Sequence, residues 1–295
     1  MRSHLLTSFV FCGLFAASTS QASPKIALKE IVVALKPDKN PDAIIKERQS
    51  LEVYLSKELG VPVKVIVPMS GAVILEGLAN GTVDLAYLAS VEMLNARDRG
   101  IAEILVGGEI AGQTSYESYW IALAAKPYTS IADLKGKPIA FTSKTSTSGY
   151  LIPYGALIKK GLLTAGSDPD NFFGSGNSWY GTGYVSAVER VLQGSAEAAA
   201  ISDYVMLKDK HLTAEQKGKL KIIDRQGPVP THVIAIRAAI KGKDRETILA
   251  AVTKLNEPAN TALRDQVFTS KLIQVDATKH LQNTAEALKL TGLKL

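Results

Sequence analysis

The chain has 295 residues, of which 46% are hydrophobic and 21% charged, and its formal net charge is +6. The positive balance suits an anionic ligand, but the basic residues are scattered and form no dense stripe with interleaved aromatic residues, as nucleic-acid binding would require. Nucleic acid is therefore not expected as a partner. Cys12 is the only cysteine, which excludes an intrachain disulfide framework and a thiolate metal cluster.

The N-terminal residues have the layout of a secretory signal peptide. Arg2 supplies a positive charge, residues 5–17 form an apolar run, and the polar stretch that follows ends in the small residue Ala22. We expect cleavage after Ala22, which assigns residues 1–22 to the signal peptide and places the mature chain in the periplasm. The apolar run is too short for an ordinary membrane anchor, and no later segment offers about 18 consecutive apolar residues.

Strands and helices alternate in the first part of the mature chain. Strands are expected over residues 30–35, 61–67 and 83–88, and helices over 43–59 and 72–79. Strands that alternate with helices predict a parallel sheet covered on both faces.

The alternation returns in the middle of the chain and indicates a second lobe with its own sheet. A first crossing between the lobes is expected near 115–125, and an extended apolar segment at 228–237 crosses back. We therefore predict an α/β fold of two lobes, each a mostly parallel sheet flanked by helices, joined by two hinge crossings. The expected boundaries are 23–120 and 234–295 for lobe 1 and 121–233 for lobe 2. Further strands are expected over 138–142 and 198–202, and further helices over 150–160, 185–192, 244–255, 259–268 and 284–290.

Residues 140–150 are the most informative segment, because they run from the end of a buried strand into the start of a helix. Hydroxyl side chains occupy five of the six positions 143–148. The first amides of a helix have no internal partner and carry a partial positive charge, so such a segment can hold an oxyanion without arginine. Gly149 would let the backbone approach the ligand closely. A helix cap at Ser146 or Thr147 is the simpler alternative, but five hydroxyls exceed what a cap needs.

This segment resembles the hallmark of the PhnD-like periplasmic phosphate/phosphite/phosphonate-binding proteins, a hydroxyl-rich loop ending in glycine and followed by an aromatic residue and a proline. Residues 145–150 with Pro153 match that pattern, and residues 59–63, 80–87 and 187–203 are similar to the family as well. The resemblance covers essentially the whole mature chain. It implies the two-lobed periplasmic-binding-protein fold and the role of solute-binding component of an ABC importer. The implied partners are a small phosphorus oxyanion (a phosphonate, phosphite or phosphate) and a membrane permease.

The resemblance also implies roles for individual residues. Ser146, Thr147 and Ser148 would hold the oxygen atoms on phosphorus, and Tyr87 would face them from the other lobe. Asp203 would close the far side of the cleft. A buried carboxylate beside an anion is tolerable only when a proton lies between them, so Asp203 would favour a protonated oxyanion or a ligand with an amino group.

Three segments depart from the family pattern and leave the contacts of the ligand's other end open. Residues 70–71 replace an acidic residue and a tyrosine, residues 88–90 replace a glycine and proline, and residues 174–184 form a longer loop. In that loop, Trp179 and Tyr184 could wall the ligand or serve as packing anchors, with Tyr180 nearer to solvent. Tyr116 and Tyr119 suggest hinge packing, and His232 could donate to an anion or be structural. The candidate ligand-binding residues are Thr145, Ser146, Thr147, Ser148, Gly149, Tyr87, Asp203, Trp179, Tyr184 and His232.

An enzyme is the main competing class, and the common catalytic patterns do not occur. The sequence has no His-Glu-x-x-His zinc motif, no Gly-x-Ser-x-Gly nucleophile elbow, no Walker-type loop and no dinucleotide fingerprint. We expect a monomer that is not an enzyme and that needs neither a metal nor a cofactor. A sulfonate or nitrate binder of related architecture, and a ligand-sensing subunit of a membrane signalling system, stay open as alternatives.

Overall fold

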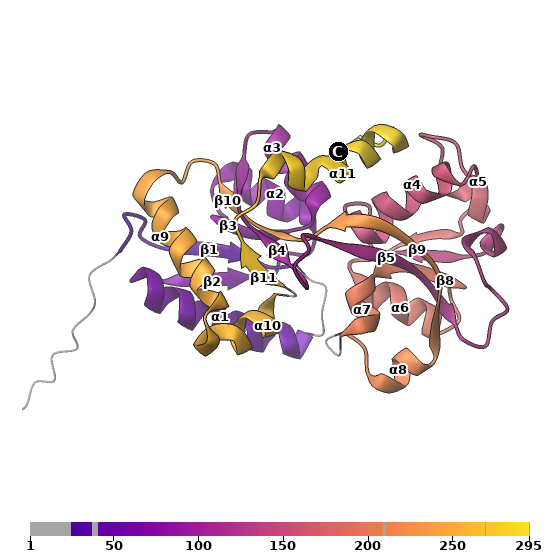
Figure 1. Ribbon diagram of the computed structural model, residues 1–295, viewed down its shortest axis with the longest axis horizontal. Coiled ribbons are helices and arrows are strands. Elements are labelled where there is room, and N and C mark those ends of the chain that lie inside the picture. The colour runs from indigo at the N-terminus through magenta and orange to yellow at the C-terminus, as the bar shows by residue number, and fades with distance from the viewer. Residues whose placement is uncertain (1–24, 37–40, 209–210, 269, 295) are drawn as a thin grey trace, which may run out of the picture.

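The computed structural model describes residues 25–36, 41–208, 211–268 and 270–294. It contains a six-stranded and a five-stranded β-sheet, which lie side by side with helices on their faces (Figure 1). We call the part around the six-stranded sheet lobe 1 and the part around the five-stranded sheet lobe 2. The predicted signal peptide lies outside the described residues.

The sheet of lobe 1 combines four early strands with two late ones. These are β1 (Ile31–Ala34), β2 (Val63–Ile66), β3 (Leu85–Leu88), β4 (Ala102–Glu109), β10 (Val233–Arg237) and β11 (Lys271–Ile273), in the order β11-β4-β10-β3-β1-β2. The first three run parallel, as predicted, whereas β10 runs antiparallel to both β3 and β4. The helices of this lobe are α1 (Pro41–Leu59), α2 (Gly71–Asn80), α3 (Ser90–Asp98), α9 (Gly242–Thr253) and α10 (Thr261–Val267), with 3-10 turns at Lys254–Asn256 and Pro258–Asn260.

The sheet of lobe 2 has the same mixed character. Its strands are β5 (Ser115–Leu123), β6 (Ile139–Phe141), β7 (Ser178–Tyr180), β8 (Ala198–Ser202) and β9 (Leu220–Pro230), in the order β7-β6-β8-β5-β9. Strand β6 pairs in parallel with β7 and β8, while β5 runs antiparallel to β8 and β9. The helices are α4 (Ile152–Lys159), α5 (Asp170–Phe173), α6 (Tyr184–Leu192), α7 (Asp203–Leu207) and α8 (Ala214–Gly218), with a π-helical turn at Thr147–Leu151 before α4 and a 3-10 turn at Ile131–Leu134.

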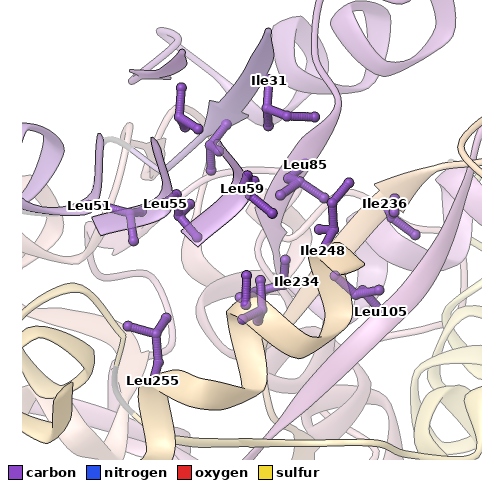
Figure 2. Packing of buried hydrophobic residues seen from close by; sticks show 14 of the residues in the cluster. Ile31, Leu51, Leu55, Leu59, Leu85, Leu105, Ile234, Ile236, Ile248 and Leu255 are labelled. Carbon is purple, nitrogen blue, oxygen red and sulfur yellow. The ribbon is translucent and has the colours of Figure 1, made fainter. Parts of the chain in front are cut away.

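One part of the core of lobe 1 lies between its sheet and α1. Leu51, Leu55 and Leu59 are spaced four residues apart, which places them on one face of the helix. Each is at most 2% exposed and packs with Ile31 and Leu85 of the sheet (Figure 2). Full burial of a leucine side chain contributes about 1.5–3 kcal/mol, so this face fixes α1 against the strands.

The chain crosses between the two sheets through residues 110–114 and 231–232. The strands next to these crossings run antiparallel to their neighbours, so each sheet is mixed rather than mostly parallel. The predicted first crossing near 115–125 is occupied by β5, and the predicted lobe boundary after residue 120 falls inside this strand. Residues 115–119 pair with β9, with a shift in register between Tyr116 and Ser118.

The last helix, α11 (Ala277–Thr291), packs against both lobes (Figure 1). Leu281 belongs to the buried cluster beneath α2 and α3 in lobe 1, whereas Leu293, just beyond the helix, packs against the cluster around Trp120 and Tyr154 in lobe 2. The carbonyl of Thr291 also accepts a hydrogen bond from the amide of Gly166, at 2.8 Å. Within the described ranges no helix has the length and hydropathy that a membrane span requires.

Candidate functional site

The hydroxyl-rich segment, residues 143–148, follows β6 and runs into the π-helical turn Thr147–Leu151 that precedes α4. We call it the site loop. Ser146 caps this turn, because its Oγ accepts a hydrogen bond from the amide of Gly149 at 2.9 Å. The side chains of Thr147 and Ser148 are at most 1% exposed and lie at the helical N-terminus, where the backbone dipoles favour negative charge. The prediction of a strand followed by a hydroxyl-rich helix start is confirmed.

Thr147 reaches across to lobe 1 and contacts the N-terminus of α3. Its Oγ1 accepts a hydrogen bond from the amide of Val91 at 3.0 Å and another from the hydroxyl of Ser90 at 3.1 Å. Two helix N-termini, one from each lobe, therefore converge on one side chain. Because both termini carry partial positive charge, the space between them favours an anion.

A buried carboxylate lies beside the same junction. Glu92 is the third residue of α3, and its Oε2 accepts hydrogen bonds from the amide of Ala89 and from the ammonium of Lys36, each at 2.9 Å. Its Oε1 accepts a hydrogen bond from the hydroxyl of Thr145 in the site loop, at 3.2 Å. The side chain of Glu92 is only 1% exposed, so Lys36 supplies the positive charge that a buried carboxylate requires.

Ser148 faces the opposite side, toward tyrosine side chains of lobe 2. Its Oγ lies 2.9 Å from the hydroxyl of Tyr184 and accepts a hydrogen bond from the hydroxyl of Tyr116 at 3.2 Å. Its carbonyl accepts a hydrogen bond from Ser118 Oγ at 2.6 Å. Burial, and then the neighbouring Tyr184, raise the pKa of the Tyr116 hydroxyl well above its ordinary range, so Tyr116 stays a proton donor. Tyr184 thus contacts the site loop and also packs in the core of lobe 2, and its role as a wall of the ligand stays a prediction.

Tyr87 and His232 bring lobe 1 and the second crossing to this group. Their rings stack at 5.1 Å between centroids, and His232 also stacks on Tyr116 at 6.1 Å. All three side chains are buried. The structure therefore joins Tyr87 and His232 to the site loop through Tyr116, a residue that the sequence suggested only as hinge packing.

Asp203 starts α7 at the carboxyl end of β8, next to the strand that leads into the site loop. It accepts hydrogen bonds from the amide of Glu117 at 3.1 Å and from the hydroxyl of Ser202 at 3.3 Å. Desolvation raises the pKa of Asp203, although hydrogen bonds from the amides of Glu117 and Tyr204 act in the opposite direction. A carboxyl group with a raised pKa can share a proton with a ligand more readily than an ordinary aspartate.

Trp179 lies in β7 and packs beneath the guanidinium of Arg190 on α6, 4.6 Å from the ring centroid. This contact fits the packing role that the sequence allowed for Trp179, and its role as a wall of the ligand stays a prediction. Tyr180 stacks on Phe141 at 5.5 Å, and its side chain is partly buried. Tyr180 is more exposed than the buried Tyr184, and the pairing of β7 with β6 places its ring over Phe141.

Sequence reasoning missed the contribution of α3. A glutamate at the third position of a helix is a known capping signal, and residues 89–92 carry it without a serine or threonine at the cap. That signal could have revealed the helix start, but not its contact with Thr147. Within the described ranges no group of three or more histidine, cysteine, aspartate or glutamate side chains is arranged to hold a metal ion.

Comparisons with known proteins show which family the chain belongs to. The model of the family described as "ABC transporter, phosphonate, periplasmic substrate-binding protein" matches residues 33–280. The chain belongs to this family. A curated relative, the phosphate-import protein PhnD of Mycolicibacterium smegmatis, is 26% identical over 249 residues, which cover 80% of this chain and 77% of the relative.

Solved structures of the phosphonate-binding family share the fold. PhnD1 of Prochlorococcus marinus in complex with methylphosphonate is 19% identical, with a TM-score of 0.77 over 88% of this chain and 97% of the other. A binding protein component of an ABC phosphonate transporter from Pseudomonas aeruginosa is also 19% identical, with a TM-score of 0.78 over 88% and 86% of the two chains. The prediction of a two-lobed periplasmic-binding-protein fold is confirmed, as is the prediction of a PhnD-like solute-binding component of an ABC importer.

Proposed function

We propose that this chain binds a small phosphorus oxyanion, a phosphonate, phosphite or phosphate, between its lobes and delivers it to the membrane permease of an ABC importer. The observation that carries the proposal is the convergence of two helix N-termini on Thr147. Donors that converge from both lobes hold a ligand only when the lobes come together, which is the form that an importer would recognise.

The phosphorus end of the ligand is assigned to the site loop. Ser146, Thr147 and Ser148 present hydroxyl groups beside the first amides of a helix, and Gly149 leaves no side chain between that backbone and Thr142. Such amides and hydroxyls bind oxyanions through short, charge-assisted hydrogen bonds. The formal net charge of +6 suits this ligand class.

The other end of the ligand is assigned to the aromatic side. Tyr87, His232 and Tyr184 would surround a short substituent, and Asp203 would accept a proton from the ligand, either from an oxygen or from an amino group. The raised pKa of Asp203 and its place at the same sheet edge as the site loop support this role. Trp179 is left out of the proposed contacts, since it packs on Arg190.

The cellular setting follows from the family and from the N-terminal sequence. The family is one of periplasmic proteins, and we propose that residues 1–22 direct secretion and are then removed. The mature chain would act as a monomer without a metal, cofactor, nucleic acid or catalytic activity. Its two partners would be the oxyanion and the permease.

Thermal unfolding of residues 23–295 tests the proposal directly. Phosphate, phosphite, methylphosphonate, 2-aminoethylphosphonate, sulfate and taurine are added one at a time. A ligand that binds only the folded state stabilises it by about 2.7 kcal/mol at 100 times its dissociation constant, which a melting curve resolves. We expect a shift with at least one phosphorus compound. Shifts with sulfate or taurine alone would overturn the proposed ligand class in favour of a sulfur oxyanion.

A further inference from the structure

The hydrogen bonds around the site loop fix the direction in which two of its hydroxyl protons point. A threonine hydroxyl has one proton to donate and two lone pairs that accept. Thr145 donates its proton to Oε1 of Glu92, at 3.2 Å. Ser143 Oγ lies 3.4 Å from Thr145 Oγ1, so Ser143 must be the donor of that second contact. One lone pair of Thr145 is then left for a ligand.

Thr147 has the opposite polarity. Its Oγ1 accepts from both Val91 and Ser90, so both lone pairs are used and its own proton is left to donate. Two hydroxyls that are two residues apart therefore present an acceptor and a donor to the same junction between the lobes.

We propose that Glu92 is the residue that sets this polarity and thereby restricts the site to oxyanions that carry a proton. This inference rests on the proposed function, since it takes the site loop as the place where the oxyanion binds. Thr145 can accept a hydrogen bond from the ligand and Thr147 can donate one to it. The ligand therefore needs one protonated and one unprotonated oxygen. A singly protonated phosphonate or phosphate offers both, whereas a sulfate or sulfonate at neutral pH has no proton to offer.

The surroundings of Glu92 keep it in the accepting role. Its Oε2 is held by two donors, the Lys36 ammonium and the Ala89 amide, and Lys36 is the cation that contacts it. Oε1 is then the atom that remains for Thr145. A site that leaves an unpaired acceptor facing a ligand acceptor rejects that ligand, because neither group can make a hydrogen bond.

Gly71 provides the space that this arrangement needs. A Cβ atom at this position would lie 2.0 Å from Oε1 of Glu92 and 3.2 Å from Oγ1 of Thr145. Gly71 is the first residue of α2, and its φ is not in the left-handed region, so alanine would suit the helix better if the carboxylate were elsewhere. The glycine is therefore explained by the position of Glu92 against Thr145.

The decisive experiment compares methylphosphonate with methanesulfonate, which have the same shape and differ in the proton on oxygen. Dissociation constants for both are measured by calorimetry at pH 7 for the wild-type protein and for Glu92→Gln. Glutamine has the same size, and its amide can donate to Thr145, which then donates toward the ligand. We expect the preference for methylphosphonate over methanesulfonate to fall by at least ~10-fold, which corresponds to about 1.4 kcal/mol.

Matched variants separate this effect from a loss of charge or of folding. Glu58→Gln removes another carboxylate that pairs with a lysine, Lys254, at 3.0 Å, and should leave the preference unchanged. Gly71→Ala should lower the preference by displacing Glu92. Thr145→Ser keeps the hydroxyl and should keep the preference, whereas Thr145→Val should lose it.

The outcomes distinguish this inference from the proposed function. A wild-type protein that binds no phosphorus oxyanion would overturn the proposed function itself. A wild-type protein that prefers methylphosphonate, together with a folded Glu92→Gln variant of equal preference, would overturn the role of Glu92 alone. Should Glu92→Gln fail to fold, the Thr145 pair decides: equal preference in Thr145→Val and Thr145→Ser would overturn the inference.

Discussion

The hydroxyl of Thr284 on α11 donates to the hydroxyl of Ser90 at the start of α3, over 2.8 Å, and neither side chain reaches solvent. Ser90 in turn donates to Thr147 in the site loop. The C-terminal helix is thus connected to the candidate binding residue of the opposite lobe through one chain of hydrogen bonds. Each proton in this chain points toward the site.

We expect Thr284→Val to weaken ligand binding although Thr284 contacts no ligand. Valine keeps the shape but cannot donate, so Ser90 loses the bond that orients it toward Thr147. A neutral hydrogen bond contributes about 0.5–1.5 kcal/mol, which predicts a loss of about 2- to 10-fold in affinity for the phosphorus compound that binds best. Calorimetry measures the affinity, and Thr253→Val, which removes a hydroxyl on α9, serves as the control. Equal affinities in Thr284→Val and Thr253→Val would contradict the role of this chain of hydrogen bonds in binding.

Gly149→Ala should destabilise the protein and abolish binding. The added Cβ would lie 1.8 Å from Thr142 Oγ1, and Thr142 is itself buried. Overpacking of this kind costs about 1–3 kcal/mol, and it would displace the amides that we assign to the oxyanion. Denaturant unfolding measures the loss of stability, and calorimetry measures the loss of binding. Thr142→Ala should restore part of the lost stability when combined with Gly149→Ala, and a double variant no better than the single one would show that the clash lies elsewhere.

Asp203→Asn should raise stability at neutral pH while it changes the ranking of ligands. The folded-state pKa of Asp203 is raised, mainly by desolvation, so the folded protein binds this proton more readily than the unfolded chain does. Stability from this group is therefore present at low pH and is lost as pH rises through the folded pKa. Melting temperatures of both proteins between pH 4 and pH 8 should show a gap that closes toward pH 4. A wild-type protein that is the more stable one at pH 7 would count against the buried position of Asp203.

Acidification should destabilise the protein through His280. Its Nε2 donates to the carbonyl of Thr231 at 2.9 Å, and burial lowers its pKa, because the charged ring would lose its hydration. The unfolded chain then binds the proton more readily, so stability is full above about pH 6.5 and falls as pH drops below that value. His280→Gln should show a weaker fall between pH 7 and pH 5 in thermal unfolding. If stability fell in parallel with pH for the wild-type protein and for His280→Gln, His280 would be excluded as the source of the acid destabilisation.

Local sequence patterns predicted part of lobe 2 and the strand and helix start on either side of the site loop. Strand β8 has the predicted bounds, residues 198–202, since its apolar run is continuous and buried. Strand β9 was missed over most of its length, because residues 224–226 are polar and one side of this edge strand is open. Residues 107–108 in β4 are glycines, which hid that strand as well.

The residues of the candidate site divide in the same way, into those that a local sequence pattern indicates and those that only the fold brings together. The site loop could be found because its hydroxyls and the following helix start are adjacent in the sequence. Glu92 could not be assigned, because its meeting with Thr145 depends on how two lobes come together across 53 residues of chain. The sequence suggests only hinge packing for Tyr116, because the contact of its hydroxyl with Ser148 depends on the fold.

The position of α11 changes what an opening motion would require. Two crossings alone would let the lobes turn about the line that joins residues 110–114 and 231–232. Because α11 packs against both lobes (Figure 1), an opening motion would leave it with one lobe and separate it from the other. Separation from lobe 1 breaks the bond between Thr284 and Ser90, while separation from lobe 2 breaks the bond between Thr291 and Gly166. An opening motion would therefore divide the molecule along one face of α11, so that one of the two bodies carries a helix that now also packs on the other.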